Sequence, residues 1–117
     1  MIEKMKVSFD FDSTLEHPEM QELARKFIAM KCEVWITTSR TLRRSGMQLI
    51  NEDVFNVAKS LDIEKNVQFT DFEPKSDYLL GFDLHFDDNE TEVREVNESS
   101  NPCIAVHYEH IQINKRL

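Results

Sequence analysis

Hydrophobic and polar positions along the chain follow two different periods. Short runs rich in Val, Ile and Phe have the length and composition of buried β-strands. Between these runs, apolar residues recur at three- and four-residue spacing, which indicates amphipathic helices. The runs that predict strands are 6–10, 33–37, 67–70, 84–87 and 104–107, and the segments that predict helices are 18–30, 50–61, 76–80 and 89–98.

This alternation of strands and helices predicts an α/β fold. Right-handed crossover connections would give a three-layer, Rossmann-like domain, with a mainly parallel five-stranded sheet and helices on both faces. Ligands of such sheets bind beyond the carboxyl ends of the strands. Polar residues from distant parts of the sequence should therefore meet at that edge, and they are Asp10, Asp12, Thr38, Asp87 and Asp88.

Composition fits one domain over residues 1–117, because 40% of the residues are hydrophobic and can form a core. The 22 acidic and 14 basic residues give a net charge of −8, which argues against non-specific nucleic-acid binding across the whole surface. We find neither a signal peptide nor an apolar run near the ~20 residues of a membrane helix, so we expect a cytoplasmic protein without a membrane partner. Cys32 and Cys103 lack metal-type spacing and are expected as free thiols.

The acidic strand ends suggest a cation site. Four carboxylates, on Asp10, Asp12, Asp87 and Asp88, would repel one another strongly unless a cation neutralised them. Mg²⁺ suits this role, because it favours oxygen ligands and needs only two or three carboxylates. A cation held there would also screen an incoming phosphate, so that a carboxylate can attack phosphorus. Further groups could bind phosphoryl oxygens, namely Thr38, Ser39 and Lys75.

Four segments, in order, resemble the motifs of the haloacid dehalogenase-like hydrolases. VSFDFDSTL (7–15) is similar to the first motif, an apolar strand that ends in Asp-x-Asp-x-Thr. VWITTSR (34–40) is similar to the second, an apolar strand that ends in Thr or Ser, and DLHFDDN (83–89) is similar to the acidic fourth. EPKSDYL (73–79) supplies a lysine for the third. The resemblance covers residues 6–89 and implies a Mg²⁺-dependent phosphatase.

The resemblance implies a role for each matching residue. Asp10 would be the nucleophile that forms an aspartyl-phosphate, and its carboxylate would also bind Mg²⁺. Asp12 would protonate the leaving group and then activate water, with its backbone carbonyl on the metal. Thr38 would bind the transferring phosphoryl group. Lys75 would orient the nucleophile and the phosphate.

At some positions two residue assignments remain open. Asp88 is expected to contact the metal directly, and Asp87 through water. Asp87, Asp88 and Asn89 could also cap the N-terminus of the following helix. Thr37 and Thr38 compete for the threonine position of the second motif, and the strand register favours Thr38.

The lysine of the third motif also has competitors. Lys59 lies within a predicted helix and Lys65 precedes a predicted strand, so Lys75 is preferred. The family commonly has Gly where this chain has Ser13, and the turn there is expected to need a permissive backbone.

A basic cluster follows the second motif and is formed by Arg40, Arg43 and Arg44. It is either a solvated loop or, with Ser39, part of a site for a phosphate-rich substrate such as a nucleotide or a nucleic-acid end. The spacing between motifs leaves no room for a cap domain, which implies an open site. A second copy of the chain could cover such a site, which would give a homodimer a purpose.

A rival interpretation is a binding or regulatory domain that keeps the carboxylates and the metal but does not catalyse. A response-regulator receiver is disfavoured, because its phosphoacceptor lies on the third strand and its paired acids lie at the first. This chain has Asp-x-Asp at the first predicted strand and Asp-Asp at the fourth.

Overall fold

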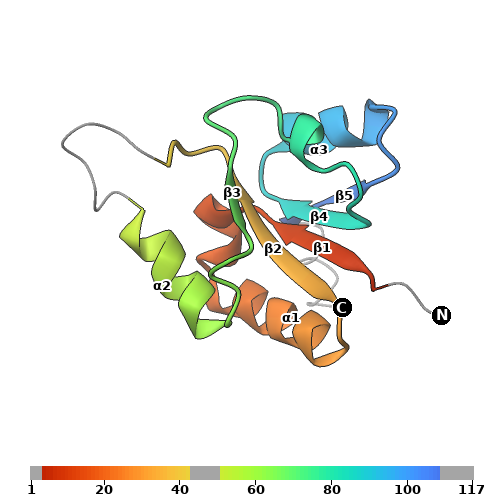
Figure 1. The fold of residues 1–117 in the computed structure, drawn as a ribbon. Helices are drawn as coiled ribbons and strands as arrows, with labels where there is room; N and C mark the ends of the chain where they lie inside the picture. Colours follow the sequence, from red (N-terminus) through yellow and green to blue (C-terminus); the bar gives the residue numbers. More distant parts are fainter. Residues whose placement is uncertain (1–3, 43–50, 109–117) are drawn as a thin grey trace.

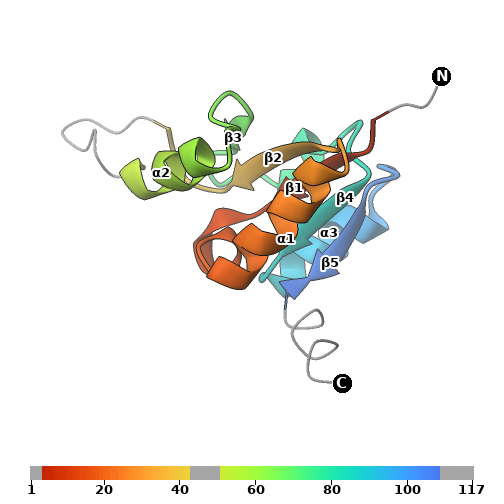
Figure 2. The same ribbon diagram turned by 90° about the horizontal axis from the view of Figure 1, so that it is seen from below.

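The computed structural model describes residues 4–42 and 51–108, in which a five-stranded sheet separates two layers of helices (Figure 1; Figure 2). The strands are β1 (Lys6–Phe9), β2 (Glu33–Thr38), β3 (Val67–Phe69), β4 (Leu84–Asp87) and β5 (Ile104–His107). The helices are α1 (Pro18–Ala29), α2 (Glu52–Ser60) and α3 (Glu90–Glu98), with a π-helical turn η1 (Phe11–Leu15) and a 3₁₀ helix η2 (Lys75–Tyr78). Within the described ranges, no helix has the length and apolar character needed to cross a membrane.

All neighbouring strands are parallel, and their order in the sheet is β3-β2-β1-β4-β5. The chain leaves the central strand β1 toward β2 and β3, and then returns to the other side of β1 to form β4 and β5 (Figure 1). The strand order therefore reverses between β1 and β4. Parallel sheets bind ligands at such a switch point, beyond the carboxyl ends of the strands. The predicted α/β fold is confirmed, and the sheet is entirely parallel rather than mainly so.

Helices α1 and α2 cover one face of the sheet, and α3 covers the other (Figure 1). Successive residues of a strand point to opposite faces, so a sheet covered on both sides has a core on each face. The larger core lies under α1 and α2 and includes Val7, Phe9, Val34, Ile36, Met20, Ala24, Val54 and Ala58. The smaller core lies under α3 and contains Leu79, Phe82, Val96, Cys103 and Ala105. Burying each large apolar side chain contributes about 1.5–3 kcal/mol, and the larger core, which includes Val7, Phe9 and Phe86, holds β1 and β4 in place.

The predicted elements match the observed ones to within about two residues at their ends. Pro18 occupies the first turn of α1, where the missing amide hydrogen costs nothing. Helix α2 begins at Glu52, two residues after the predicted start, and residues 43–50 lie outside the described ranges. The turn η1 was not predicted, and it matters because it follows the end of β1 directly. Cys32 and Cys103 are free thiols, as expected.

Candidate active site

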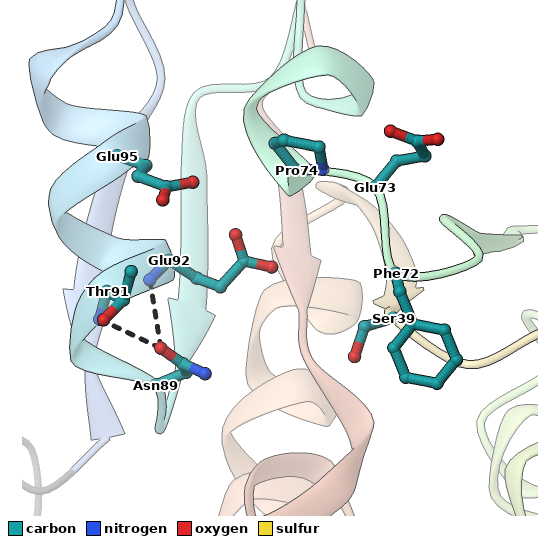
Figure 3. A pocket seen from close by; sticks show the side chains of 8 residues that line it. All are labelled: Ser39, Phe72, Glu73, Pro74, Asn89, Thr91, Glu92 and Glu95. Carbon is teal, nitrogen blue, oxygen red and sulfur yellow. Dashed lines mark hydrogen bonds between the residues drawn. The ribbon is translucent and has the colours of Figure 1, made fainter.

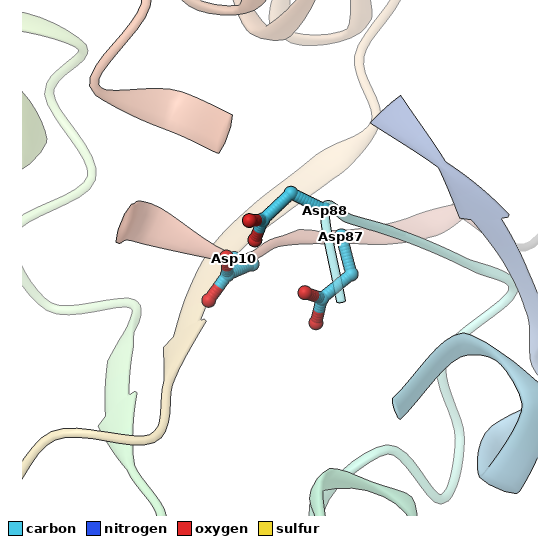
Figure 4. Close-up of side chains that lie close together, drawn as sticks. All are labelled: Asp10, Asp87 and Asp88. Atoms are coloured by element: carbon cyan, nitrogen blue, oxygen red, sulfur yellow. The ribbon is translucent and has the colours of Figure 1, made fainter. Parts of the chain in front are cut away.

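Three carboxylates meet at the switch point between β1 and β4 (Figure 4). Asp10 follows β1, Asp87 ends β4 and Asp88 comes next in the chain. Each of the three offers an oxygen within 4.8 Å of the others. The backbone amide of Asp10 donates to the carbonyl of Phe86 at 2.8 Å, which ties the end of β1 to β4. Asp10 and Asp87 are buried, whereas Asp88 is half-buried.

Lys75 lies between two of these carboxylates. Its Nζ is 2.7 Å from Asp10 Oδ1 and 2.7 Å from Asp87 Oδ2, and the residue is only 1% exposed. Burial alone would lower the pKa of Lys75, but the charges of Asp10 and Asp87 raise it. The competing residues Lys59 and Lys65 are exposed. Of the three lysines, the structure therefore brings Lys75 to the acidic strand ends.

The two buried carboxylates differ in their affinity for protons. Burial raises the pKa of Asp10 well above its ordinary value, and the negative charge of Asp87 adds to the rise. Burial would also raise the pKa of Asp87, but the contacts with His85 and with Lys75 together lower it below its ordinary value. Asp87 is therefore the charged partner of Lys75, while Asp10 has more to gain from a further cation.

The donor set fits a hard divalent cation. With all three carboxylates ionised, one ammonium group would leave two negative charges for a cation to compensate, and oxygen is the ligand atom that Mg²⁺ prefers. Asp87 Oδ2 already accepts from both Lys75 and His85, and Asp87 Oδ1 accepts from the amide of Asn89. These bonds favour direct metal contact by Asp10 and Asp88, with Asp87 acting through water.

Thr38 and Ser39 lie at the end of β2, next to β1. Thr38 is buried, and its Oγ1 accepts a hydrogen bond from the amide of Arg40 at 3.3 Å. The competing Thr37 is held within the sheet, because its Oγ1 contacts both Ser8 and Gln68. Thr38 is thus the better-placed threonine at the strand end.

The side chain of Asp12 lies outside the cluster of three carboxylates and pairs with Arg40. Arg40 Nε donates to Asp12 Oδ2 at 3.0 Å, and Arg40 Nη2 donates to Asp12 Oδ1 at 2.6 Å. The same guanidinium donates to both carboxylate oxygens of Asp53 in α2 and lies over the ring of Phe11, 5.2 Å from its centroid. Its donors thus contact protein groups, so substrate binding by Arg40 stays a prediction. The other two arginines of the predicted cluster, Arg43 and Arg44, lie outside the described residues.

A pocket of about 320 Å³ opens next to the ends of β2 and β4, where Ser39 and Asn89 line it (Figure 3). Residues of α3 and Asn89 form one wall, and the segment 72–74 with Ser39 forms the other. The lining residues are Ser39, Phe72, Glu73, Pro74, Asn89, Thr91, Glu92 and Glu95. Three of the eight are glutamates, so the pocket beside the candidate phosphate site is acidic.

No known family model, curated protein or solved structure matches this chain. The resemblance carried by the four motifs therefore stays a prediction. What the site can do chemically has to be inferred from its own residues.

His85 belongs to the site, although the sequence pattern indicated only a strand residue. It is fully buried, with Nε2 2.8 Å from Asp87 Oδ2 and Nδ1 2.9 Å from Ser8 Oγ. Burial lowers the pKa of His85, which favours the neutral ring. The two-residue spacing of His85 and Asp87 in a strand predicts that both point to one face. The contact of His85 with Ser8 could not be predicted, because it depends on the order of the strands in the sheet, which the hydrophobic pattern does not reveal.

Proposed function

We propose that this protein is a Mg²⁺-dependent phosphatase of the haloacid dehalogenase-like type, which hydrolyses a phosphomonoester through an aspartyl-phosphate on Asp10. The observation that carries the proposal is the position of Lys75 Nζ, buried between Asp10 and Asp87 with Asp88 alongside. The stability of the fold does not require such a cluster, because replacing a buried ion pair by well-packed apolar residues often leaves stability unchanged or increases it. A buried carboxylate oriented by an ammonium group is suited to nucleophilic attack.

In the first half-reaction, an oxygen of Asp10 attacks phosphorus, and the bond from phosphorus to the leaving oxygen breaks. Lys75 holds Asp10 by a direct hydrogen bond and offsets negative charge in the site. Thr38 and Ser39 supply hydroxyl groups at the neighbouring strand end. Asp10, Asp87 and Asp88 would hold Mg²⁺, which when bound supplies positive charge to offset that of the phosphate.

Asp12 is the candidate acid and base. As an acid it gives a proton to the leaving oxygen, and as a carboxylate it later takes a proton from the water that hydrolyses the aspartyl-phosphate. Both of its oxygens accept hydrogen bonds from Arg40 in this conformation. The mechanism therefore requires that the Asp12 side chain leave Arg40 when substrate binds.

The charge of the pocket bears on the choice of substrate. A nucleic-acid end, or a nucleotide with more than one phosphate, brings further phosphates, which would meet Glu73, Glu92 and Glu95 at close range. A phosphomonoester whose leaving group carries no additional negative charge is therefore the better candidate. A homodimer that covers the open site remains a prediction.

One observation favours a second candidate function. The pairing of Asp12 with Arg40 leaves the proposed acid away from the cluster, as expected for a binding domain that holds a cation and phosphate without turnover. Such a domain would keep the roles of Asp10, Lys75 and Asp88 as binding groups.

Hydrolysis of an aryl phosphate, with and without Mg²⁺, separates these functions. The phosphatase predicts turnover that needs Mg²⁺ and falls to background in Asp10→Asn. The matched control is Asp62→Asn, the same chemical change at an exposed residue in the turn after α2, which should leave turnover unaltered. Mg²⁺ binding by calorimetry without any hydrolysis would instead support the binding domain.

A further inference from the structure

We propose that His85 is a positioning residue that sets the orientation of Asp87 through a hydrogen-bond chain across four strands. The link from this chain to catalysis rests on the proposed function. The existence of the chain rests only on the contacts of the described residues.

The chain runs from β3 to β4 on the α3 face of the sheet. Gln68 Nε2 donates to Thr37 Oγ1 at 2.9 Å, and Thr37 Oγ1 lies 2.6 Å from Ser8 Oγ. Ser8 Oγ lies 2.9 Å from His85 Nδ1, and His85 Nε2 lies 2.8 Å from Asp87 Oδ2. The strand register allows these contacts, because Thr37 pairs with Gln68 and Ser8 pairs with His85.

The two ends of the chain have fixed roles. The amide nitrogen of Gln68 can only donate, and the ionised carboxylate of Asp87 can only accept. Thr37 Oγ1 accepts from both Gln68 and Ser8, and the ring of His85 bridges Ser8 Oγ and Asp87 Oδ2.

Burial makes each contact of this chain matter. Ser8, Thr37 and His85 are all fully buried, and each has its hydrogen-bond partners within the chain. An unpaired buried polar group is costly, so removing one member would leave its neighbours without partners.

The consequence for the site is a carboxylate fixed before any ligand binds. Asp87 is held by His85 and Lys75 on Oδ2 and by the amide of Asn89 on Oδ1. Losing His85 frees Asp87 to turn, and Lys75 and its partner Asp10 can move with it. Groups that hold metal ligands in this way typically change metal affinity or activity by about 10–100-fold when removed.

The test compares His85→Met, which keeps bulk but removes both ring nitrogens, with His85→Gln, whose amide can donate to Asp87. Val96→Ala is the matched control, because Val96 is fully buried on the same face of the sheet and its apolar side chain forms no hydrogen bond. The amide resonance of Asn89, which donates to Asp87 Oδ1, reports the orientation of Asp87 without metal or turnover.

We expect a shifted Asn89 amide in His85→Met and recovery in His85→Gln. Mg²⁺ affinity should weaken by about 10–100-fold in His85→Met and stay unchanged in Val96→Ala. An unshifted Asn89 amide in His85→Met, or an equal shift in Val96→Ala, would overturn the inference. Absence of turnover in the wild type would count against the proposed function alone, because the Asn89 signal does not depend on turnover.

Discussion

At the residue scale, Arg40 connects the candidate acid to helix α2. Its guanidinium pairs with Asp12 at 2.6 Å and with Asp53 at 2.8 Å. Both carboxylates are about half exposed, so each ion pair should contribute no more than about 1 kcal/mol to stability. The two aspartates are therefore similar structurally but differ in proposed chemistry, which makes them a matched pair.

We predict that Asp12→Asn lowers turnover by about 10²–10⁴-fold, the usual contribution of a general acid or base, while phosphate and Mg²⁺ still bind. Asp53→Asn removes the other partner of Arg40 and should leave turnover near that of the wild type. Steady-state kinetics and thermal melts of both variants check this. Equal losses in the two variants would mean that Arg40, rather than Asp12, accounts for the effect.

The sequence predicted some residues of the site but not others. Asp10, Asp87 and Asp88 were predictable because each ends or follows an apolar strand, and parallel strands end at one edge. To predict Lys75, its position between two predicted strands was needed as well as its positive charge. His85 was missed, because its partner Ser8 is 77 residues away and lies beside it only through the strand order.

At the scale of elements, the turn η1 explains a departure from the resembled motif. Ser13 has φ of 60° and ψ of 15°, in the left-handed region that favours glycine. Its amide donates to the side chain of Glu16 at 2.6 Å, and the turn continues until the backbone amide of Leu15 donates to the carbonyl of Asp10. The expected need for a permissive backbone is confirmed, and serine adopts that conformation in this chain.

Substitutions at Ser13 should separate backbone strain from side-chain effects, because the Ser13 side chain is exposed. Ser13→Val should destabilise the fold by about 1–2 kcal/mol, since a β-branched residue is strained in the left-handed region. Ser13→Gly should stay close to the wild type, because relief of strain is offset by greater freedom of the unfolded chain. Urea unfolding measures both variants.

The control for this series is Ser100→Val, at an exposed serine without a positive φ. A similar loss in Ser100→Val would show that valine itself, rather than the turn, causes the destabilisation.

Helix and strand positions were predictable from periodicity to within about two residues. The turn η1 was not, because a left-handed residue other than Gly has no hydrophobic pattern that reveals it.

At the scale of the whole molecule, charge and topology act on the same site. The chain carries a net charge of −8, and the reversal of strand order brings Asp10 beside Asp87 and Asp88. Helix α3 starts next to these residues and contributes Glu92 and Glu95 to the pocket. Periodicity predicts that helix, but not that its glutamates face the pocket, because that depends on how α3 packs on the sheet.

The acidic pocket predicts discrimination among phosphomonoesters by the charge of the leaving group. We expect a higher kcat/KM for a monoester with a neutral leaving group than for one that carries a second phosphate. Repulsion between unit charges about 4 Å apart in water is about 1 kcal/mol, which corresponds to roughly a fivefold difference. Added salt should reduce the difference, because the Debye length falls to about 3 Å at 1 M.

Replacing Glu92 and Glu95 by Gln should narrow this preference several-fold, and the effect should appear mainly for the substrate with two phosphates. Glu64→Gln, at an exposed residue outside the pocket, is the matched control and should leave the preference unchanged. Preference for the doubly phosphorylated substrate in the wild type, unaffected by either change, would contradict the role of the acidic wall. It would direct attention to Arg43 and Arg44, the predicted anion-binding residues that lie outside the described ranges.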